Sequence, residues 1–186
     1  MQINNKRYND LDSYYKRKFN KKIIKLPIDG GFTCPNRDGT LSSLGCIYCS
    51  DLGSGEWTSG DLLDIKAQIA DQKKKLSKKS RDEAYIAYFQ NFTNTYGDVR
   101  KMREIFFKAV NDEDIVGLSI ATRADCLDDD VISLLEELNE LTDLTIELGM
   151  QSVNDKTLKF INRGYDHQSF DNGVQKLNQW GIDIIA

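Results

Sequence analysis

Residues 84–122, "AYIAYFQNFTNTYGDVRKMREIFFKAVNDEDIVGLSIAT", contain the pattern that decides the fold. The short apolar and aromatic run Ala84–Phe89 is typical of a buried strand, and Asp114–Thr122 predicts a second strand. Between these strands, Asp98 is a suitable N-cap for a helix whose apolar residues recur at helical spacing, at Val99, Met102, Phe106 and Ala109. A strand, a helix and a strand in this order predict parallel pairing through a crossover connection.

The same alternation continues on both sides of this unit. The sequence predicts further strands in "KIIKLPI" (22–28), Asp143–Met150 and "IDIIA" (182–186), and further helices over Asp61–Lys79, 128–141, Asn154–Ile161 and about His167–Trp180. About five βα units are too few for a closed eight-stranded barrel. We therefore expect an α/β fold with parallel strands, either an open partial (β/α) barrel or a doubly wound sheet. No GxGxxG or P-loop pattern follows a predicted strand, which weakens a nucleotide-binding Rossmann interpretation.

Length and composition indicate a globular cytoplasmic protein. The chain has 186 residues, of which 40% are hydrophobic and 29% are charged, so it can bury one sizeable core. No apolar run reaches the roughly 18 residues that a membrane helix needs, and no secretory segment follows Met1. Because cytosolic thiols stay reduced, clustered cysteines in such a protein more often bind metal or carry out redox chemistry than form disulfides.

Three of the four cysteines lie in one glycine-rich stretch, "GGFTCPNRDGTLSSLGCIYCS", from Gly30 to Ser50. Cys46 and Cys49 form a C-x-x-C pair, and Cys34 precedes them in the same loop. A structural zinc ion prefers four ligands, so three thiolates leave it one short, with Cys126 or the single histidine, His167, far away in sequence. An iron–sulfur cluster with one open iron would use three thiolates completely. From spacing alone, zinc and a cluster are about equally supported.

The first 22 residues form a basic segment that we expect to pack on a core of residues 23–186. Lysines and arginines crowd this end of the chain, with tyrosines and a phenylalanine between them, at Lys6, Arg7, Lys16, Arg17, Lys18, Lys21 and Lys22. Such a stretch can track phosphates and stack bases, although an ordinary solvated helix face has the same composition. The net charge of −4 argues against nucleic acid binding over the whole surface.

The cysteine stretch resembles the cluster loop of radical S-adenosylmethionine (radical SAM) enzymes. "CPNRDGTLSSLGCIYCS" looks like a subgroup with a widened first gap, because eleven residues separate Cys34 from Cys46 where the usual motif has three. This subgroup is related to the elongator-type and oxygen-independent coproporphyrinogen oxidase branches. "GGFTCPNRDGT" and the following "GSGEW" resemble the YhcC/YtqA-like radical SAM proteins almost word for word. The resemblance runs from about Tyr8 to the end of the chain and favours the partial barrel over the doubly wound sheet.

This resemblance implies two cofactors and a set of residues that bind them. Cys34, Cys46 and Cys49 would hold a [4Fe-4S] cluster, whose open iron would bind S-adenosylmethionine. Tyr48 would contact the adenine of S-adenosylmethionine, and strand-end residues and an amide and guanidinium pair would make the other contacts. The complete set is Tyr48, Gln90, Asn91, Thr93, Thr122, Arg123, Gln151 and Arg163. One-electron cleavage would give a 5′-deoxyadenosyl radical that abstracts hydrogen from a substrate. No catalytic side chain is assigned.

Other expectations follow from the same resemblance. The electron would come from a donor such as flavodoxin or ferredoxin, and RNA is one candidate substrate. The rival function is a non-catalytic zinc module built on the same cysteines. Glu147 could bind cofactor hydroxyls or act as a base, although it also suits the mouth of a barrel. Cys126 would lie on the side of the substrate, although a buried small residue is the alternative. Because the resembling family continues beyond "WGIDIIA", we expect this chain to be a fragment whose barrel lacks its last strand and C-terminal part.

Overall fold

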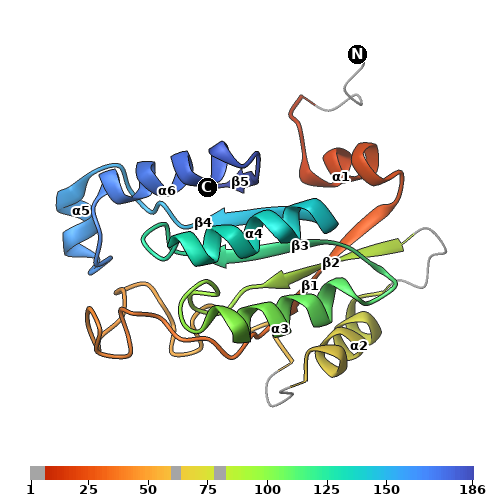
Figure 1. Ribbon diagram of the computed structural model, residues 1–186, viewed down its shortest axis with the longest axis horizontal. Helices are drawn as coiled ribbons and strands as arrows, with labels where there is room; N and C mark the ends of the chain where they lie inside the picture. Colours follow the sequence, from red (N-terminus) through yellow and green to blue (C-terminus); the bar gives the residue numbers. More distant parts are fainter. Residues whose placement is uncertain (1–6, 60–63, 78–82) are drawn as a thin grey trace.

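Five parallel strands form one open sheet in the computed structural model, which describes residues 7–59, 64–77 and 83–186 (Figure 1). The strands lie in chain order, each parallel to the next: β1 (Lys22–Ile28), β2 (Glu83–Phe89), β3 (Ile115–Thr122), β4 (Asp143–Leu148) and β5 (Asp183–Ile185). Sequential order with helical crossovers is the arrangement of part of a (β/α) barrel. The predicted α/β fold with an open set of parallel strands is therefore confirmed.

Helices connect successive strands, and acidic or amide side chains begin them. Between or after the strands lie α2 (Ile65–Leu76), α3 (Val99–Val110), α4 (Asp129–Leu141), α5 (Asp155–Phe160) and α6 (His167–Gln179). Each begins after an Asp or Asn whose side chain accepts a backbone N–H of the first turn, namely Asp64, Asp98, Asp128, Asn154 and Asp166. The predicted ends of the second helix, 61 and 79, lie outside the described residues. β4 ends at Leu148, two residues earlier than predicted.

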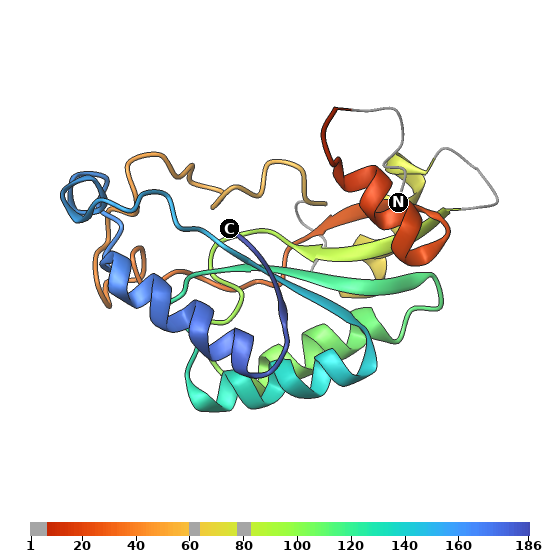
Figure 2. The same cartoon turned by 90° about the horizontal axis from the view of Figure 1, so that it is seen from above.

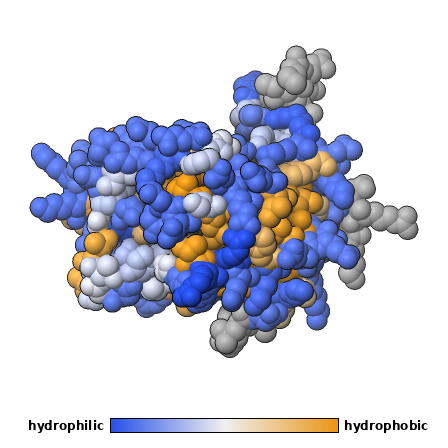
Figure 3. All heavy atoms as spheres, in the orientation of Figure 1, coloured by the Kyte–Doolittle hydropathy of each residue, from blue (hydrophilic) through white to orange (hydrophobic). Residues whose placement is uncertain are grey.

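The two faces of the sheet differ in character. One face carries fully buried apolar side chains and meets the helices; Phe89 of β2, for example, contacts Phe106 of α3 with ring centroids 4.9 Å apart. Figure 2 shows α3, α4 and α6 on this side, and the long loop after β1 on the other. The opposite face carries polar side chains, because residues alternate along a strand. The outer surface in Figure 3 is largely hydrophilic, with apolar areas near its centre and to the right of it.

The N-terminal helix α1 (Leu11–Phe19) contacts the sheet at its amino-terminal side. Tyr15 is buried there, and Lys18 pairs with Asp143 of β4 and with Asp183 of β5. Lys22 lies 3.9 Å from Glu83. Several of the basic side chains in this part of the chain are therefore engaged with carboxylates of the core. Among the helices of the described residues, none has both the length and the apolar character needed to cross a bilayer.

Gly173 of α6 offers a test of the packing between helix and sheet. A Cβ at this position would lie 2.8 Å from the Ala124 Cβ and 2.9 Å from the Ala124 carbonyl oxygen, just after β3. We predict that Gly173→Ala lowers the free energy of unfolding by about 1–3 kcal/mol through overpacking, although Ala favours a helix over Gly by about 1 kcal/mol. Chemical denaturation measures the change, with Gln175→Ala on the exposed side of α6 as the control. A more stable Gly173→Ala variant would show that α6 is not tightly packed here.

Candidate cofactor site

In its described part, residues 29–59, the loop between β1 and α2 contains three cysteines and no helix or strand, so tight turns give it its shape. The Cys34 carbonyl accepts hydrogen bonds from the backbone N–H groups of Arg37 (2.8 Å) and Asp38 (3.1 Å). The Cys46 carbonyl accepts from the Cys49 N–H at 3.0 Å, which closes the C-x-x-C turn. Between these turns, the Gly45 N–H donates to the Asn36 carbonyl at 2.8 Å. Both cysteine-bearing turns are thus held beside each other within the loop.

Segments distant in sequence hold this loop in place. Asn162, after α5, donates from its amide to the Gly45 carbonyl at 2.7 Å, and the Ile47 N–H donates to the Ile161 carbonyl at 3.1 Å. Gly164 lies so close to the loop that a Cβ there would stand 2.8 Å from Asn36 Oδ1. Its φ of +82° also favours glycine. The "INRGY" segment is therefore a support for the cysteine loop, a role that the sequence did not indicate.

A cavity of about 390 Å³ opens between the cysteine loop and the polar face of the sheet. Its wall includes Cys34, Cys46 and Cys49 together with strand-end residues from β2, β3 and β4. Of the predicted S-adenosylmethionine contacts, the cavity wall contains Tyr48, Gln90, Thr93, Thr122, Arg123, Gln151 and Arg163. The structure thus brings together residues separated by more than a hundred positions, at the carboxyl edge where parallel α/β folds place their sites.

Asn91 is the one predicted contact that the structure does not place in this wall. It is buried, and its amide donates to the Asp29 carboxylate at 2.9 Å. The side chain lies under Gly55, where a Cβ would come within 2.1 Å of the Asn91 amide nitrogen. Asn91 therefore supports the end of the cysteine loop from behind, because neighbouring residues at a strand end point to opposite sides.

The predicted contacts in the wall differ in how accessible they are. Tyr48 is 49% exposed, Gln151 is exposed, and Gln90 is partly exposed while donating to the Ser54 carbonyl. Thr93, Thr122 and Arg123 are buried. Arg123 forms a two-point ion pair with Asp125, at 2.8 and 2.9 Å, and donates to the Arg163 carbonyl. The Arg123 guanidinium therefore makes its hydrogen bonds to other groups of the protein.

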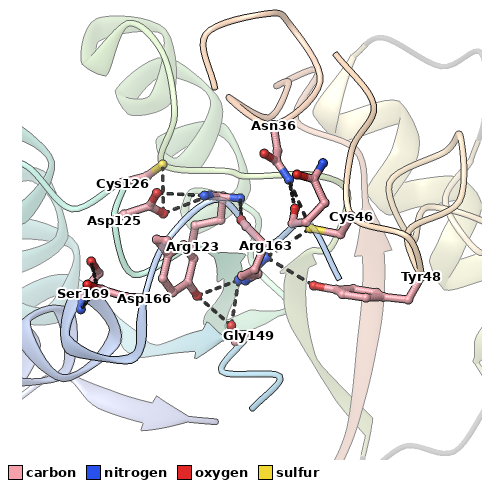
Figure 4. Close-up of polar contacts among 12 residues, drawn as sticks. Asn36, Cys46, Tyr48, Arg123, Asp125, Cys126, Gly149, Arg163, Asp166 and Ser169 are labelled. Carbon is pink, nitrogen blue, oxygen red and sulfur yellow. Dashed lines mark hydrogen bonds and ion pairs between the residues drawn. The ribbon is translucent and has the colours of Figure 1, made fainter. Parts of the chain in front are cut away.

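Arg163 lies against one of the cysteines (Figure 4). Its Nη1 is 4.0 Å from Cys46 Sγ and 3.4 Å from the Tyr48 hydroxyl, while Nη2 donates to the Gly149 carbonyl at 2.7 Å and to the Tyr165 hydroxyl at 2.8 Å. Burial raises the pKa of Tyr48 well above its usual value, although the Arg163 charge opposes this shift. The Tyr48 phenol is thus a neutral group at the edge of the cavity.

A polar cluster on the sheet borders the cavity. Lys25 of β1 forms an ion pair with Glu147 of β4, and Ser119 of β3 hydrogen-bonds to both side chains. The Lys25 ammonium lies 4.7 Å from the centre of the Tyr88 ring, and burial together with Glu147 raises the pKa of the Tyr88 phenol. Tyr88 and Glu147 both line the cavity. Of these residues, the sequence analysis singled out only Glu147. The others are polar residues on otherwise apolar strands.

Cys126 faces a different space from the other three cysteines. It lines a second cavity with Asp38, Thr95 and Asp125. Burial and the Asp125 carboxylate raise the pKa of Cys126 to about 12. Across residues 7–59, 64–77 and 83–186, no three histidine, cysteine, aspartate or glutamate side chains are grouped so that they could hold a single metal ion.

Comparison with known proteins identifies the family. The model of the radical SAM superfamily matches residues 39–186, a range that includes Cys46 and Cys49 but begins after Cys34. This chain belongs to the radical SAM superfamily. Its resemblance to the YhcC/YtqA-like group is also confirmed. YtqA of Bacillus subtilis is 46% identical over 181 residues, and YhcC of Escherichia coli K12 is 37% identical over 171 residues.

These relatives are longer than the present chain. The matched region covers 97% of this chain but 56% of YtqA, and 91% of this chain but 54% of YhcC. The chain therefore spans about half the length of the relatives. Among solved structures, the cobalamin-dependent S-adenosylmethionine radical enzyme OxsB superposes with a TM-score of 0.56 at 13% identity, over 94% of this chain and 24% of OxsB. At this identity the superposition shows a shared fold only.

The raised pKa of Cys126 predicts its reactivity. Its thiol should ionise far above the ordinary pKa of about 8.5, so alkylation of the folded chain by iodoacetamide should still rise by about tenfold between pH 9.5 and 10.5. When the chain is unfolded in urea, the alkylation rate of Cys126 should be nearly constant between pH 9.5 and 10.5. Mass spectrometry on a variant with Cys34, Cys46 and Cys49 changed to serine measures this rate, with circular dichroism as the check on folding. Folded and unfolded rates that level off at the same pH would contradict the assignment.

Proposed function

We propose that this chain is the cofactor-binding core of a radical SAM enzyme, with a [4Fe-4S] cluster on Cys34, Cys46 and Cys49 and S-adenosylmethionine beside it. The observation that supports this function best is the common cavity: all three cysteines of the loop line it together with polar residues from three strand ends. A site for a cluster alone would not need these strand-end residues. A site for a nucleoside alone would not need the three thiols.

The residues present fit both groups. Three thiolates are the donor set of a cluster with one open iron. Two buried polar atoms in the wall, Thr93 Oγ1 and Arg163 Nε, have no hydrogen-bond partner within the described residues, so a bound group could supply one. When bound, the cluster and S-adenosylmethionine supply a one-electron cleavage that yields methionine and a 5′-deoxyadenosyl radical, which abstracts hydrogen from a substrate.

The chain's own side chains would bind, orient and shield these groups. Tyr48, Gln90 and Gln151 present accessible polar or aromatic surface, so they would contact S-adenosylmethionine directly. Thr122 and Arg123 are buried behind the cavity surface and would position the wall. The buried part of the wall would shield the bound groups from water, which protects reactive intermediates from side reactions.

The arrangement of the thiols supports a cluster more than the alternative zinc module. A zinc ion requires its ligands to converge on one point, whereas each thiolate of a cubane cluster binds a different iron. The three thiols share a cavity wall, and Cys126, the candidate for a fourth zinc ligand, lines another cavity. We therefore retain the cluster as the proposed group.

We also propose partners and a substrate for the whole protein. The function requires an electron donor such as flavodoxin or ferredoxin. RNA is a candidate substrate, but Lys18, Lys22 and Lys25 are engaged with carboxylates and leave less free positive charge than the sequence suggests. The part of the cavity wall formed by Tyr88 and Glu147 is the part of the site that we assign to substrate.

The cluster assignment predicts a specific pattern of iron content. After anaerobic reconstitution, the chain should hold about four irons, as a [4Fe-4S] cluster requires. Cys34→Ala, Cys46→Ala and Cys49→Ala should each lose the cluster, and Cys126→Ala should keep it because this thiol lines another cavity. Iron analysis and visible absorption provide the measurement. Zinc that stays bound in place of iron, or loss of the cluster in Cys126→Ala, would reject the proposal.

The S-adenosylmethionine assignment predicts a separate effect for Gln151. This amide is exposed at the cavity and forms no side-chain hydrogen bond within the described residues. Removing one hydrogen bond to ligand in Gln151→Ala should weaken S-adenosylmethionine binding by about tenfold, or about 1.4 kcal/mol, with iron content unchanged. Calorimetric titration compares it with Gln168→Ala on α6, which should bind as the wild type does. Equal affinity in Gln151→Ala and wild type would remove this residue from the site.

A further inference from the structure

Exposed apolar side chains gather on and beside the cysteine loop. Leu44 of the loop is 85% exposed, and Phe160 of α5 is 77% exposed. Apolar residues that are exposed singly need no explanation, whereas a group of them on one part of a surface marks an interaction site. Among the described residues, about half of the large exposed apolar side chains lie in the loop or in residues 153–160, namely Leu41, Leu44, Ile47, Tyr48, Leu52, Trp57, Val153 and Phe160.

The loop and α5 form one continuous surface. The Ile47 N–H donates to the Ile161 carbonyl at 3.1 Å, so the cysteine turn lies against the end of α5. Both segments lie side by side at the left of Figure 1 and of Figure 2, and an apolar area covers them at the left edge of Figure 3. We call the exposed residues Leu44, Ile47, Lys156, Lys159 and Phe160 together the α5 face.

The α5 face is also basic. Lys156 and Lys159 are exposed, and neither forms an ion pair with a carboxylate of the described residues. Asp155 on the same helix accepts a backbone N–H of α6, and on the loop Arg37 lies 3.7 Å from the Asp51 carboxylate. The whole chain carries a net charge of −4. An acidic partner would therefore be repelled by most of the chain and attracted at this face.

This face lies outside the proposed cluster. Cys46 and Cys49 are separated only by Ile47 and Tyr48, so the exposed Ile47 is directly bonded to a residue that would ligate iron. Cys49 is itself partly exposed. A protein bound at the α5 face would thus be separated from a thiolate by the cysteine turn alone, which gives an electron a short path to the cluster.

The proposed function requires an electron from another protein. We propose that the α5 face is the docking surface for a flavodoxin, with its acidic surface at Lys156 and Lys159 and the edge of its flavin at Phe160. An apolar face with a phenyl ring favours a flavin, because aromatic rings pack on one another. A mixture of apolar residues and lysines fits the small interfaces of transient electron-transfer complexes. This inference rests on the proposed [4Fe-4S] cluster.

The electron transfer at this face is balanced without a proton. The anionic hydroquinone of the flavin loses one electron and becomes the neutral semiquinone. The cluster gains that electron and changes from [4Fe-4S]²⁺ to [4Fe-4S]⁺. The rate of this step, at donor concentrations below saturation, reports how well the two proteins associate.

Stopped-flow absorbance of the reconstituted chain mixed with flavodoxin hydroquinone tests the docking surface. A variant with both Lys156→Glu and Lys159→Glu should be reduced about tenfold more slowly than the wild type at an ionic strength of about 10 mM. The difference should shrink at about 500 mM, because salt screens exposed charges. Phe160→Ser should slow reduction at both ionic strengths, since it removes apolar contact and no charge.

Two controls separate docking from damage to the cluster. A variant with both Lys66→Glu and Lys74→Glu on α2 changes the net charge by the same amount, at lysines that are also exposed, and should be reduced as the wild type is. Photoreduced deazariboflavin, a small uncharged reductant that needs no docking surface, should reduce all variants at the same rate. Iron analysis and circular dichroism establish that each variant holds its cluster and folds.

The outcomes distinguish this inference from the proposed function. If the wild type assembles no [4Fe-4S] cluster, the proposed function itself fails. If the wild type holds a cluster that deazariboflavin reduces but flavodoxin does not, the docking proposal is wrong while the cluster stands. Equal rates with flavodoxin in the wild type and in the Lys156 and Lys159 variant would also overturn it. An equal loss of rate in the α2 control would do the same, because net charge and not the α5 face would then be the cause.

Discussion

The site depends on one constraint: three thiols must be held in place by a loop that has no helix or strand over residues 29–59, the part that the structure describes. Backbone turns at Cys34 and Cys46 give the loop its local shape. A hydrogen bond from the Asn162 amide and one to the Ile161 carbonyl attach it to the turn after α5. Backbone groups that leave a strand must find partners elsewhere. The cysteine loop finds them on the loops at the carboxyl edge of the sheet, so the cavity and the cysteines form together.

The cavity wall combines two chemically different groups of residues. One group contains the three thiols and the Arg163 guanidinium, an environment suited to an anionic cluster. In the other, the Lys25–Glu147 ion pair is internally neutral, and the Tyr88 phenol lies at the surface of the cavity. This division separates groups that would hold cofactors from groups that would meet a substrate. The alternation of side chains along the strands produces it, because the apolar residues face the helices and the polar ones face the cavity.

Much of this architecture could be predicted from the sequence, and the rest could not be predicted for physical reasons. Strands and helices were visible because their apolar periods differ. Gln90 and Asn91 could not be separated, since the end of β2 alone decides which of them faces the cavity. Lys25 and Glu147 lie 122 positions apart, so their ion pair emerges only from strand order and register. The contacts of Arg163 with Gly149 and Tyr165 are likewise set by the tertiary structure, and no motif encodes them.

The central claim is that three cysteines leave one iron of a cluster open to the cavity, where S-adenosylmethionine binds. Electron paramagnetic resonance of the anaerobically reduced protein, before and after addition of S-adenosylmethionine, tests it most directly. The account predicts a signal from a reduced [4Fe-4S] cluster whose g values change when S-adenosylmethionine is added, because the ligand reaches the open iron. A cluster signal that is identical with and without saturating S-adenosylmethionine would contradict the account.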